Sequence, residues 1–384
     1  MIDYRYTSNT LGASANQLYF EADPEYMLTG RVFYKITQGG EYRYSLLFNN
    51  IIDSTYSDGS KSKSNRIMKE WTIHSARYAK YSADIFKNGI TEPPFRSSYG
   101  GAAIAREHGI DCVPFEAEFQ PISFDGKIGK RVCPGEIFET DEFEFYAESG
   151  EYICIELVFS GTEIPYHEES LLPIYRFRGG KWFYDKRVPL PACIGSDRTV
   201  NRRIGFLGDS ITQGIGTREY SYLHWNARLA EMLGNGYSYW NLGIGYARAD
   251  DAASAGIWLE KALLCDILFV CLGVNDLLQG FSADDIKRNL FKTVTLLKDA
   301  GKKVILQTLP PFDYCGSKIA EWEDINEYIL TVLNNKVDFV FDCVEILGAE
   351  EARHNAKYGG HPNEKGCEIW AEALFKGIKQ KELL

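Results

Sequence analysis

The sequence has little of what marks several common classes of protein. It carries 42 Lys and Arg against 53 Asp and Glu, a formal net charge of −11 at pH 7. Such an acidic balance argues against the basic surface that nucleic-acid binding requires. No apolar stretch approaches the ~18 residues of a membrane span. The first twelve residues lack a basic segment followed by an apolar one. No signal peptide is therefore predicted, and a cytoplasmic location is expected.

Metal-binding and nucleotide-binding signatures are also missing. No group of His, Cys and Asp has the spacing of metal ligands. The glycine-containing segments 214–219 and 243–248 do not form a G-x-G-x-x-G motif after a strand. The 9 cysteines include no C-x-x-C pair, which predicts reduced, mostly buried thiols. We therefore expect neither a metal nor a cofactor.

The first half of the chain has the pattern of an antiparallel β-sandwich. At 384 residues the chain is long enough for two domains, and no internal repeat is evident. Short segments rich in Tyr, Phe, Ile and Val, several alternating with period 2, predict strands of a jelly-roll-like sandwich. The polar segment 56–65 predicts an exposed loop, and 189–202 a linker, which gives domains at 1–200 and 201–384. The predicted strands are 40–50, 69–82, 115–127, 141–150 and 151–161.

The second half alternates strands and helices five times. This alternation predicts an α/β fold with a doubly wound parallel sheet, in which ligands bind at the carboxyl ends of the strands. Ser282 and Asn363 are predicted helix caps. The predicted strands are 202–208, 237–245, 265–273, 302–308 and 337–342, and the predicted helices are 222–234, 250–263, 282–301, 319–335 and 363–380.

Residues capable of chemistry follow the predicted strands. Segments 208–210, 241–245 and 273–276 come at the ends of the first three predicted strands, and 360–362 comes just before the last predicted helix. Each segment alone has an ordinary explanation, because glycines turn, asparagines cap, and a serine such as Ser210 is commonly only a helix cap. Together they would place a serine, a glycine backbone, an amide and a histidine at one end of the predicted sheet, where the strands have their carboxyl ends.

These segments resemble the four sequence blocks of the SGNH, or GDSL, hydrolase superfamily. The matching stretches are GDSIT (208–212), NLGIG (241–245), GVND (273–276) and HPNEKG (361–366), in the family's order over residues 203–384. The resemblance implies a flavodoxin-like parallel sheet and a serine esterase that works without a cofactor.

The resemblance also implies roles for individual residues. Ser210 would be the nucleophile and His361 its base, since a serine hydroxyl needs an adjacent base. The oxyanion donors would be the N–H groups of Ser210 and Gly245 and the side-chain amide of Asn275. The residues Asp209, Tyr246 and Asp276 are predicted to contact the substrate.

Two positions depart from the family pattern. The oxyanion glycine usually stands five residues after the block's asparagine, where this chain has Tyr246. We favour the Gly245 N–H over the Tyr246 N–H as donor.

The second departure concerns the acid of the triad. The family acid usually stands three residues before the histidine, and here that residue is Tyr358. We therefore expect a Ser–His dyad whose imidazole is oriented by a neutral acceptor within 355–360. A carboxylate from Asp313, Asp342 or Glu345 is the alternative.

The order of the two domains narrows the expected substrate. A β-sandwich ahead of an SGNH domain resembles bacterial carbohydrate esterases that remove acetyl groups from plant polysaccharides, some of them through a dyad. The expected partner is an acetylated oligosaccharide or another small ester; the sequence does not indicate an oligomeric state. An aromatic-rich sandwich is a candidate to bind sugar or cover the cleft. His224, Trp225 and Trp258 are candidates to line the pocket, with core packing favoured.

Three alternatives remain open. The chain could be a lipid or thioester hydrolase of the same superfamily, or a carbohydrate-binding protein with a relict hydrolase domain. A purely structural sandwich protein is the third, but it leaves the four blocks unexplained.

Overall fold

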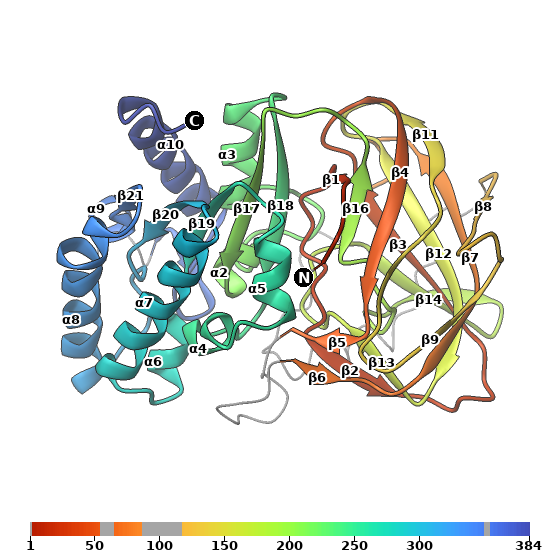
Figure 1. Ribbon diagram of the computed structural model, residues 1–384, viewed down its shortest axis with the longest axis horizontal. Coiled ribbons are helices and arrows are strands. Elements are labelled where there is room, and N and C mark those ends of the chain that lie inside the picture. Colours follow the sequence, from red (N-terminus) through yellow and green to blue (C-terminus); the bar gives the residue numbers. More distant parts are fainter. Residues whose placement is uncertain (1, 54–64, 87–116, 349–353) are drawn as a thin grey trace. The chain divides into compact units, whose positions relative to one another are not determined.

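The computed structural model describes residues 2–53, 65–86, 117–348 and 354–384 (Figure 1). The chain divides into two compact units, one of residues 3–53 and 65–199 and one chiefly of residues 200–384. The predicted loop at 56–65 lies, apart from Asn65, outside the described residues, and so does the start of the predicted strand 115–127. None of the described helices combines the length and apolar character that crossing a membrane requires.

The unit of residues 3–53 and 65–199 is built mainly from two larger antiparallel sheets with a shared core, and it also contains the two-stranded sheets β13-β2 and β5-β6. One sheet has the order β1-β16-β4-β10 with β11 also on β4, and the other has β15-β14-β3-β12-β7-β8 with β9 also on β7. The strands are β1 (Thr7–Ser8), β2 (Leu18–Glu21), β3 (Leu28–Lys35), β4 (Gly40–Asn49), β5 (Ile51–Ile52), β6 (Arg66–Ile67), β7 (Trp71–Tyr81), β8 (Gln120–Ile122), β9 (Lys130–Val132), β10 (Ile137–Glu139), β11 (Phe143–Ala147), β12 (Tyr152–Gly161), β13 (Glu163–Tyr166), β14 (Ile174–Arg178), β15 (Lys181–Tyr184) and β16 (Cys193–Ser196).

Alternation of side chains along the strands creates this core. In β11, Phe143 and Phe145 are buried whereas Glu144 and Tyr146 are exposed, because successive side chains point to opposite faces of a sheet. Residues from both sheets, such as Tyr44 of β4, join one hydrophobic cluster. The strands predicted at 40–50, 69–82, 141–150 and 151–161 are confirmed as β4, β7, β11 and β12. The jelly-roll connectivity stays a prediction.

The unit of residues 200–384 contains a parallel sheet of five strands. Their order across the sheet is β18-β17-β19-β20-β21, and all four pairings are parallel. In chain order this is 2-1-3-4-5, so the direction of winding reverses between β17 and β19, where doubly wound folds bind their ligands. The strands are β17 (Arg202–Gly208), β18 (Tyr237–Gly243), β19 (Ile267–Cys271), β20 (Lys303–Gln307) and β21 (Phe339–Phe341), with the short pair β22 (Ala356–Lys357) and β23 (His361–Pro362).

Helices lie on both faces of the parallel sheet (Figure 1). Trp225 of α3 stacks on Trp370 of α10 at a centroid distance of 5.4 Å. Trp225 and Trp258 are fully buried, so the expectation of core packing is confirmed for both. The helices are α2 (Ser210–Gln213), α3 (Trp225–Leu233), α4 (Ala249–Ala253), α5 (Ile257–Ala262), α6 (Val274–Leu278), α7 (Ala283–Asp299), α8 (Ser317–Thr331), α9 (Cys343–Leu347) and α10 (Glu364–Gln380), with 3-10 turns η2 (Leu333–Asn335) and η3 (Tyr358–Gly360).

The prediction of one continuous helix over residues 250–263 is wrong. The segment 250–263 forms two helices, α4 and α5, because the backbone turns left-handed at Ala255 with φ 58° and Gly256 begins a new helix as its N-cap. The predicted caps are confirmed, since the Ser282 side chain accepts from Asp285 N–H and Asn363 accepts from Lys365 and Gly366 N–H.

The cysteines of the described residues are all free thiols, and six of them are buried. Burial raises the pKa of the Cys265 thiol to about 12, so it stays protonated and unreactive. The prediction of reduced, mostly buried cysteines is therefore confirmed in this part of the chain.

Candidate active site

A tight turn presents Ser210 at the carboxyl end of β17. Asp209 is the N-cap of α2, and its Oδ1 accepts the Ile211 N–H at 2.9 Å. Gly214 closes the same turn with φ 115°, and its N–H donates to the Ser210 carbonyl. The four-residue helix is thus fixed at both ends, which holds the half-buried Ser210 side chain in one place.

The fold brings Ser210 and His361 together across 151 residues of sequence. Ser210 Oγ and His361 Nε2 lie 2.7 Å apart, a normal hydrogen-bond distance for a hydroxyl and an imidazole. This is the geometry that transfer of a proton from serine to histidine requires.

The backbone around His361 is tightly constrained. His361 begins β23 and pairs with Lys357 of β22. The Asn363 N–H donates to the Asn355 carbonyl at 2.8 Å, which ties the start of α10 to the same hairpin. Gly216, in the loop after α2, packs directly on this backbone: a Cβ there would overlap the Pro362 carbonyl and lie 3.1 Å from His361 Cβ.

The three carboxylates proposed from sequence as the acid of a triad have different surroundings. Asp342 Oδ1 accepts from Val344 N–H and Thr308 Oγ1, both at 3.0 Å, and so caps α9. The side chains of Asp313 and Glu345 are exposed. The Tyr358 side chain lies outside what the structure describes. Orientation of His361 by a neutral acceptor within 355–360 therefore stays a prediction.

Asn275 lies beside the glycine block, as expected. Gly273 turns the chain with φ 121° into α6, and Asn275 follows at its second residue. The amide Nδ2 donates to the Ala247 carbonyl at 3.0 Å. An asparagine amide carries two N–H donors, so this bond fixes the side chain and leaves a second donor.

Gly245 differs from its predicted role. Its N–H donates to Gln213 Oε1 at 2.7 Å, and this satisfied, buried bond corrects the expectation that the Gly245 N–H serves the oxyanion. Tyr246, at the family's glycine position, has φ 64°, the left-handed region that glycine adopts most readily. The chain thus keeps a glycine-like backbone with a tyrosine side chain, and the Tyr246 N–H replaces Gly245 as the candidate donor.

Gln213 is a further residue of the site, and the four sequence blocks do not indicate its role. Its side chain is 1% exposed, and its backbone carbonyl accepts from Asn241 Nδ2 at 3.4 Å. Gln213 therefore ties α2 to the glycine block. The only signal in the sequence was a polar residue one helical turn after Ser210.

The prediction that Asp209 and Asp276 contact the substrate is also wrong. They are 1% and 0% exposed, so neither carboxyl can face a substrate. Asp276 accepts the N–H groups of Ala249 and Asp250 at 2.8 and 3.3 Å, and Asp209 caps α2. Burial raises the pKa of each carboxyl to about 7. Both residues hold the loops of the site in place.

His224 belongs to the core beside this site. It is 3% exposed and is the N-cap of α3. Its ring packs against Gly214, where a Cβ would lie 2.9 Å from His224 Cγ. Burial lowers the pKa of the imidazole to about 4, so it stays neutral near pH 7. The expectation of a packing role is therefore confirmed.

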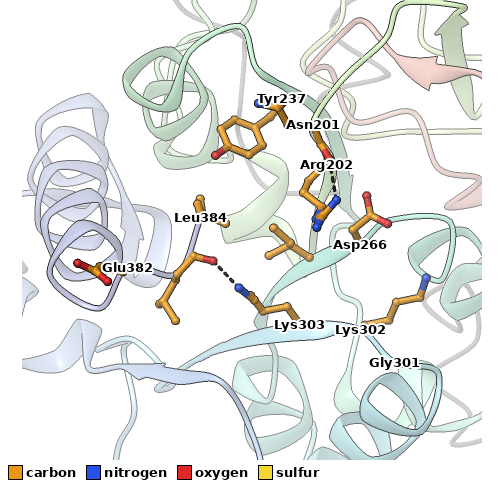
Figure 2. Close-up of a pocket in the computed structure, with 11 residues that line it drawn as sticks. Asn201, Arg202, Tyr237, Asp266, Gly301, Lys302, Lys303, Glu382 and Leu384 are labelled. Carbon is orange, nitrogen blue, oxygen red and sulfur yellow. Dashed lines mark hydrogen bonds between the residues drawn. The ribbon is translucent and has the colours of Figure 1, made fainter.

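A cavity of about 650 Å³ lies at the amino ends of the parallel strands, opposite the carboxyl ends where Ser210 lies (Figure 2). It is lined by the first residues of β17, β18, β19 and β20 and by residues 382–384. Ser210 follows the carboxyl end of β17, so this cavity is separate from the candidate active site.

Comparison with known proteins bears on the second unit. Residues 206–369 match the model of the GDSL-like lipase/acylhydrolase family. Similar solved structures include a member of the lipolytic protein G-D-S-L family from Veillonella parvula, with 19% identity over 46% of this chain and 98% of that one and a TM-score of 0.40. An acetylxylan esterase from Geobacillus stearothermophilus has 20% identity, 47% and 94% coverage and a TM-score of 0.39. A carbohydrate acetylesterase family member from Sinorhizobium meliloti has 16% identity, 48% and 100% coverage and a TM-score of 0.37. No curated protein sequence matches the chain significantly.

Proposed function

Because residues 206–369 match the model of the GDSL-like lipase/acylhydrolase family, we propose that this protein is a serine esterase that removes O-acetyl groups from oligosaccharides or polysaccharides. The observation that carries the proposal is the 2.7 Å contact between Ser210 Oγ and His361 Nε2. In a relict hydrolase domain, selection would not maintain this contact between the two side chains.

The reaction proceeds through an acyl-enzyme. His361 Nε2 takes the proton of Ser210 as Oγ attacks the ester carbonyl, and the imidazolium then protonates the sugar oxygen as the bond between that oxygen and the acyl carbon breaks, which releases the sugar hydroxyl. Water, deprotonated by the same imidazole, attacks the acetyl-serine. As the second tetrahedral intermediate collapses, the imidazolium returns its proton to Ser210 Oγ, and acetic acid leaves and ionises to acetate. The pair works as a dyad, with a neutral acceptor orienting the second ring nitrogen of His361.

The oxyanion of each tetrahedral intermediate needs donors that are fixed beforehand. The Ser210 N–H, the Tyr246 N–H and the second N–H of Asn275 serve this role. The bond from Asn275 Nδ2 to the Ala247 carbonyl supports the assignment, since it orients the amide before substrate binds.

The sugar part of the proposal rests on domain order. A β-sandwich precedes the hydrolase domain, as in the carbohydrate esterases that the sequence resembles. The sandwich domain, residues 1–200, is proposed to bind sugar or to cover the cleft of the catalytic domain, residues 201–384.

The test is release of acetate from acetylated mannan, xylan and pectin oligosaccharides by the wild-type protein and by Ser210→Ala. We expect Ser210→Ala to keep its thermal midpoint, since one hydroxyl at a turn contributes little stability, and to lose several orders of magnitude in rate. Ser254→Ala, at the end of α4, is the matched control and should retain the wild-type rate. A Ser210→Ala protein with more than about a tenth of the wild-type rate would refute the nucleophile.

A further inference from the structure

The segment between β20 and α8 contacts the ring of His361. The Phe312 and His361 rings lie 5.2 Å apart between centroids, with an interplanar angle of 74°. This edge-to-face arrangement is one that aromatic pairs prefer, so it favours one relative orientation of the two rings. The imidazole held in this way is the one whose Nε2 meets Ser210 Oγ.

Two glycines directly before His361 make room for Phe312. Gly359 and Gly360 have φ values of 81° and 133°, which other residues rarely adopt. A Cβ on Gly359 would lie 2.8 Å from Phe312 Cε1, and one on Gly360 would lie 2.8 Å from Phe312 Cα. The Asp313 N–H also donates to the Gly359 carbonyl at 2.6 Å. The loop that carries His361 and the segment that carries Phe312 are therefore packed as one piece.

Phe312 is itself anchored from its other side. Its ring lies 6.1 Å from that of Tyr314, and Tyr314 lies 5.7 Å from Trp322 of α8. The Trp322 indole N–H donates to the Leu309 carbonyl at 2.9 Å. This row of three aromatic rings connects His361 to a helix of the fold, so Phe312 has little freedom to move away.

We infer that Phe312 is a positioning residue that holds the His361 imidazole toward Ser210, in a chain that has Tyr358 at the family's aspartate position. The inference rests on the proposed esterase function. A phenyl ring has no net charge, so Phe312 restrains the orientation of the imidazole but does not stabilise the imidazolium as a carboxylate does.

The kinetic test compares Phe312→Ala with the wild-type protein on 4-nitrophenyl acetate. We expect kcat to fall by about tenfold or more, with KM changed less than about threefold, because misplacing a reacting group by about 1 Å costs up to about 10²-fold in rate. Phe291→Ala is the matched control, since Phe291 is a partly exposed phenylalanine on α7 that packs against Lys336. Should Phe312→Ala prove unfolded by circular dichroism, Phe312→Leu keeps the apolar bulk and should still lower kcat.

A second measurement reads the ring contact without activity. In histidine-labelled protein, the NMR signals of His361 are those that disappear in His361→Gln. Phe312→Ala should shift these signals, through loss of the ring current, and leave the signals of the other five of the 6 histidines in place. If the wild-type protein is active and the folded Phe312 variants keep its kcat, or change only KM, the inference about Phe312 is overturned and the proposed function stands. A wild-type protein without Ser210-dependent hydrolysis overturns the proposed function, and the NMR shift then tests only the contact.

Discussion

One buried amide, that of Gln213, accepts the backbone N–H of Gly245 beside the candidate oxyanion hole. Its Oε1 takes the Gly245 N–H at 2.7 Å, and Tyr246 then follows with φ 64°. A backbone N–H that is already bonded inside the protein cannot stabilise a developing oxyanion. The position of the Tyr246 N–H therefore depends on Gln213.

This dependence predicts that Gln213→Leu lowers both stability and activity. Leaving the Gly245 N–H buried without an acceptor costs about 1–3 kcal/mol, and a displaced oxyanion donor lowers kcat by up to about 10²–10³. Gln307→Leu is a matched control, because Gln307 is also fully buried and its Oε1 accepts from Trp370 Nε1 at 2.8 Å. Thermal melts should show similar losses for both variants, whereas ester hydrolysis should fall only for Gln213→Leu. Equal rates in the two variants would contradict the positioning role of Gln213.

At the scale of elements, the loop after α2 sets how closely β23 approaches. Gly216 has φ 104°, and a Cβ there would overlap the Pro362 carbonyl. The salt bridge from Arg218 to Glu364 of α10, at 2.7 Å, lies in the same contact but is exposed, and such pairs contribute little. Close packing of the Gly216 backbone, rather than charge, therefore holds the loop against the hairpin of His361.

We accordingly expect Gly216→Ala to push β23 away from α2 and to lower kcat by about tenfold or more, since small displacements of catalytic groups are costly. Gly234→Ala provides the comparison, because Gly234 also has a positive φ, 79°, but nothing lies within 4 Å of a Cβ there. Both variants carry the strain of a left-handed alanine, and kinetic assays of both would separate that strain from displacement of His361. Full activity in Gly216→Ala would show that the hairpin does not depend on this contact.

At the scale of the whole molecule, the two units are built by different rules. In the unit of residues 3–53 and 65–199, the antiparallel strand β11 buries alternate residues. The parallel strand β19 is buried along its whole length, as expected for a sheet covered by helices on both faces. We propose that one unit binds sugar and the other hydrolyses the ester. Because the group removed is an acetyl, the catalytic site needs to take only a small acyl group.

A small acyl group predicts a strong chain-length preference. The kcat/KM for 4-nitrophenyl acetate should exceed that for the octanoate by about 10²-fold or more, because each misfitting methylene in a tight pocket is worth about 1–3 kcal/mol. Rates should be corrected with Ser210→Ala to remove background hydrolysis. A preference for octanoate would instead favour the lipid hydrolase of the same superfamily.

The sequence by itself determined the features that depend on neighbouring residues. The caps at Ser282 and Asn363, the strands β4, β11 and β12, and the order of the four blocks all follow from local pattern and turn chemistry. The expectation that Ser210 and His361 meet rested on the family resemblance, because His361 lies in the antiparallel pair of β22 and β23 and does not follow a strand of the parallel sheet.

Only the tertiary structure decided what depends on contacts between distant segments. Gln213 is 32 residues from the Gly245 N–H that it binds, and Asp276 is 27 residues from the Ala249 N–H that it accepts. Nothing near Gly245 or Asp276 in the chain shows that these groups are already satisfied. The contact of Phe312 with His361 likewise depends on two glycines that come just before the histidine but lie far along the chain from Phe312. Whether a polar group faces a substrate or the protein is a matter of burial and hydrogen bonding, and both are fixed only when the separate strands and loops pack together.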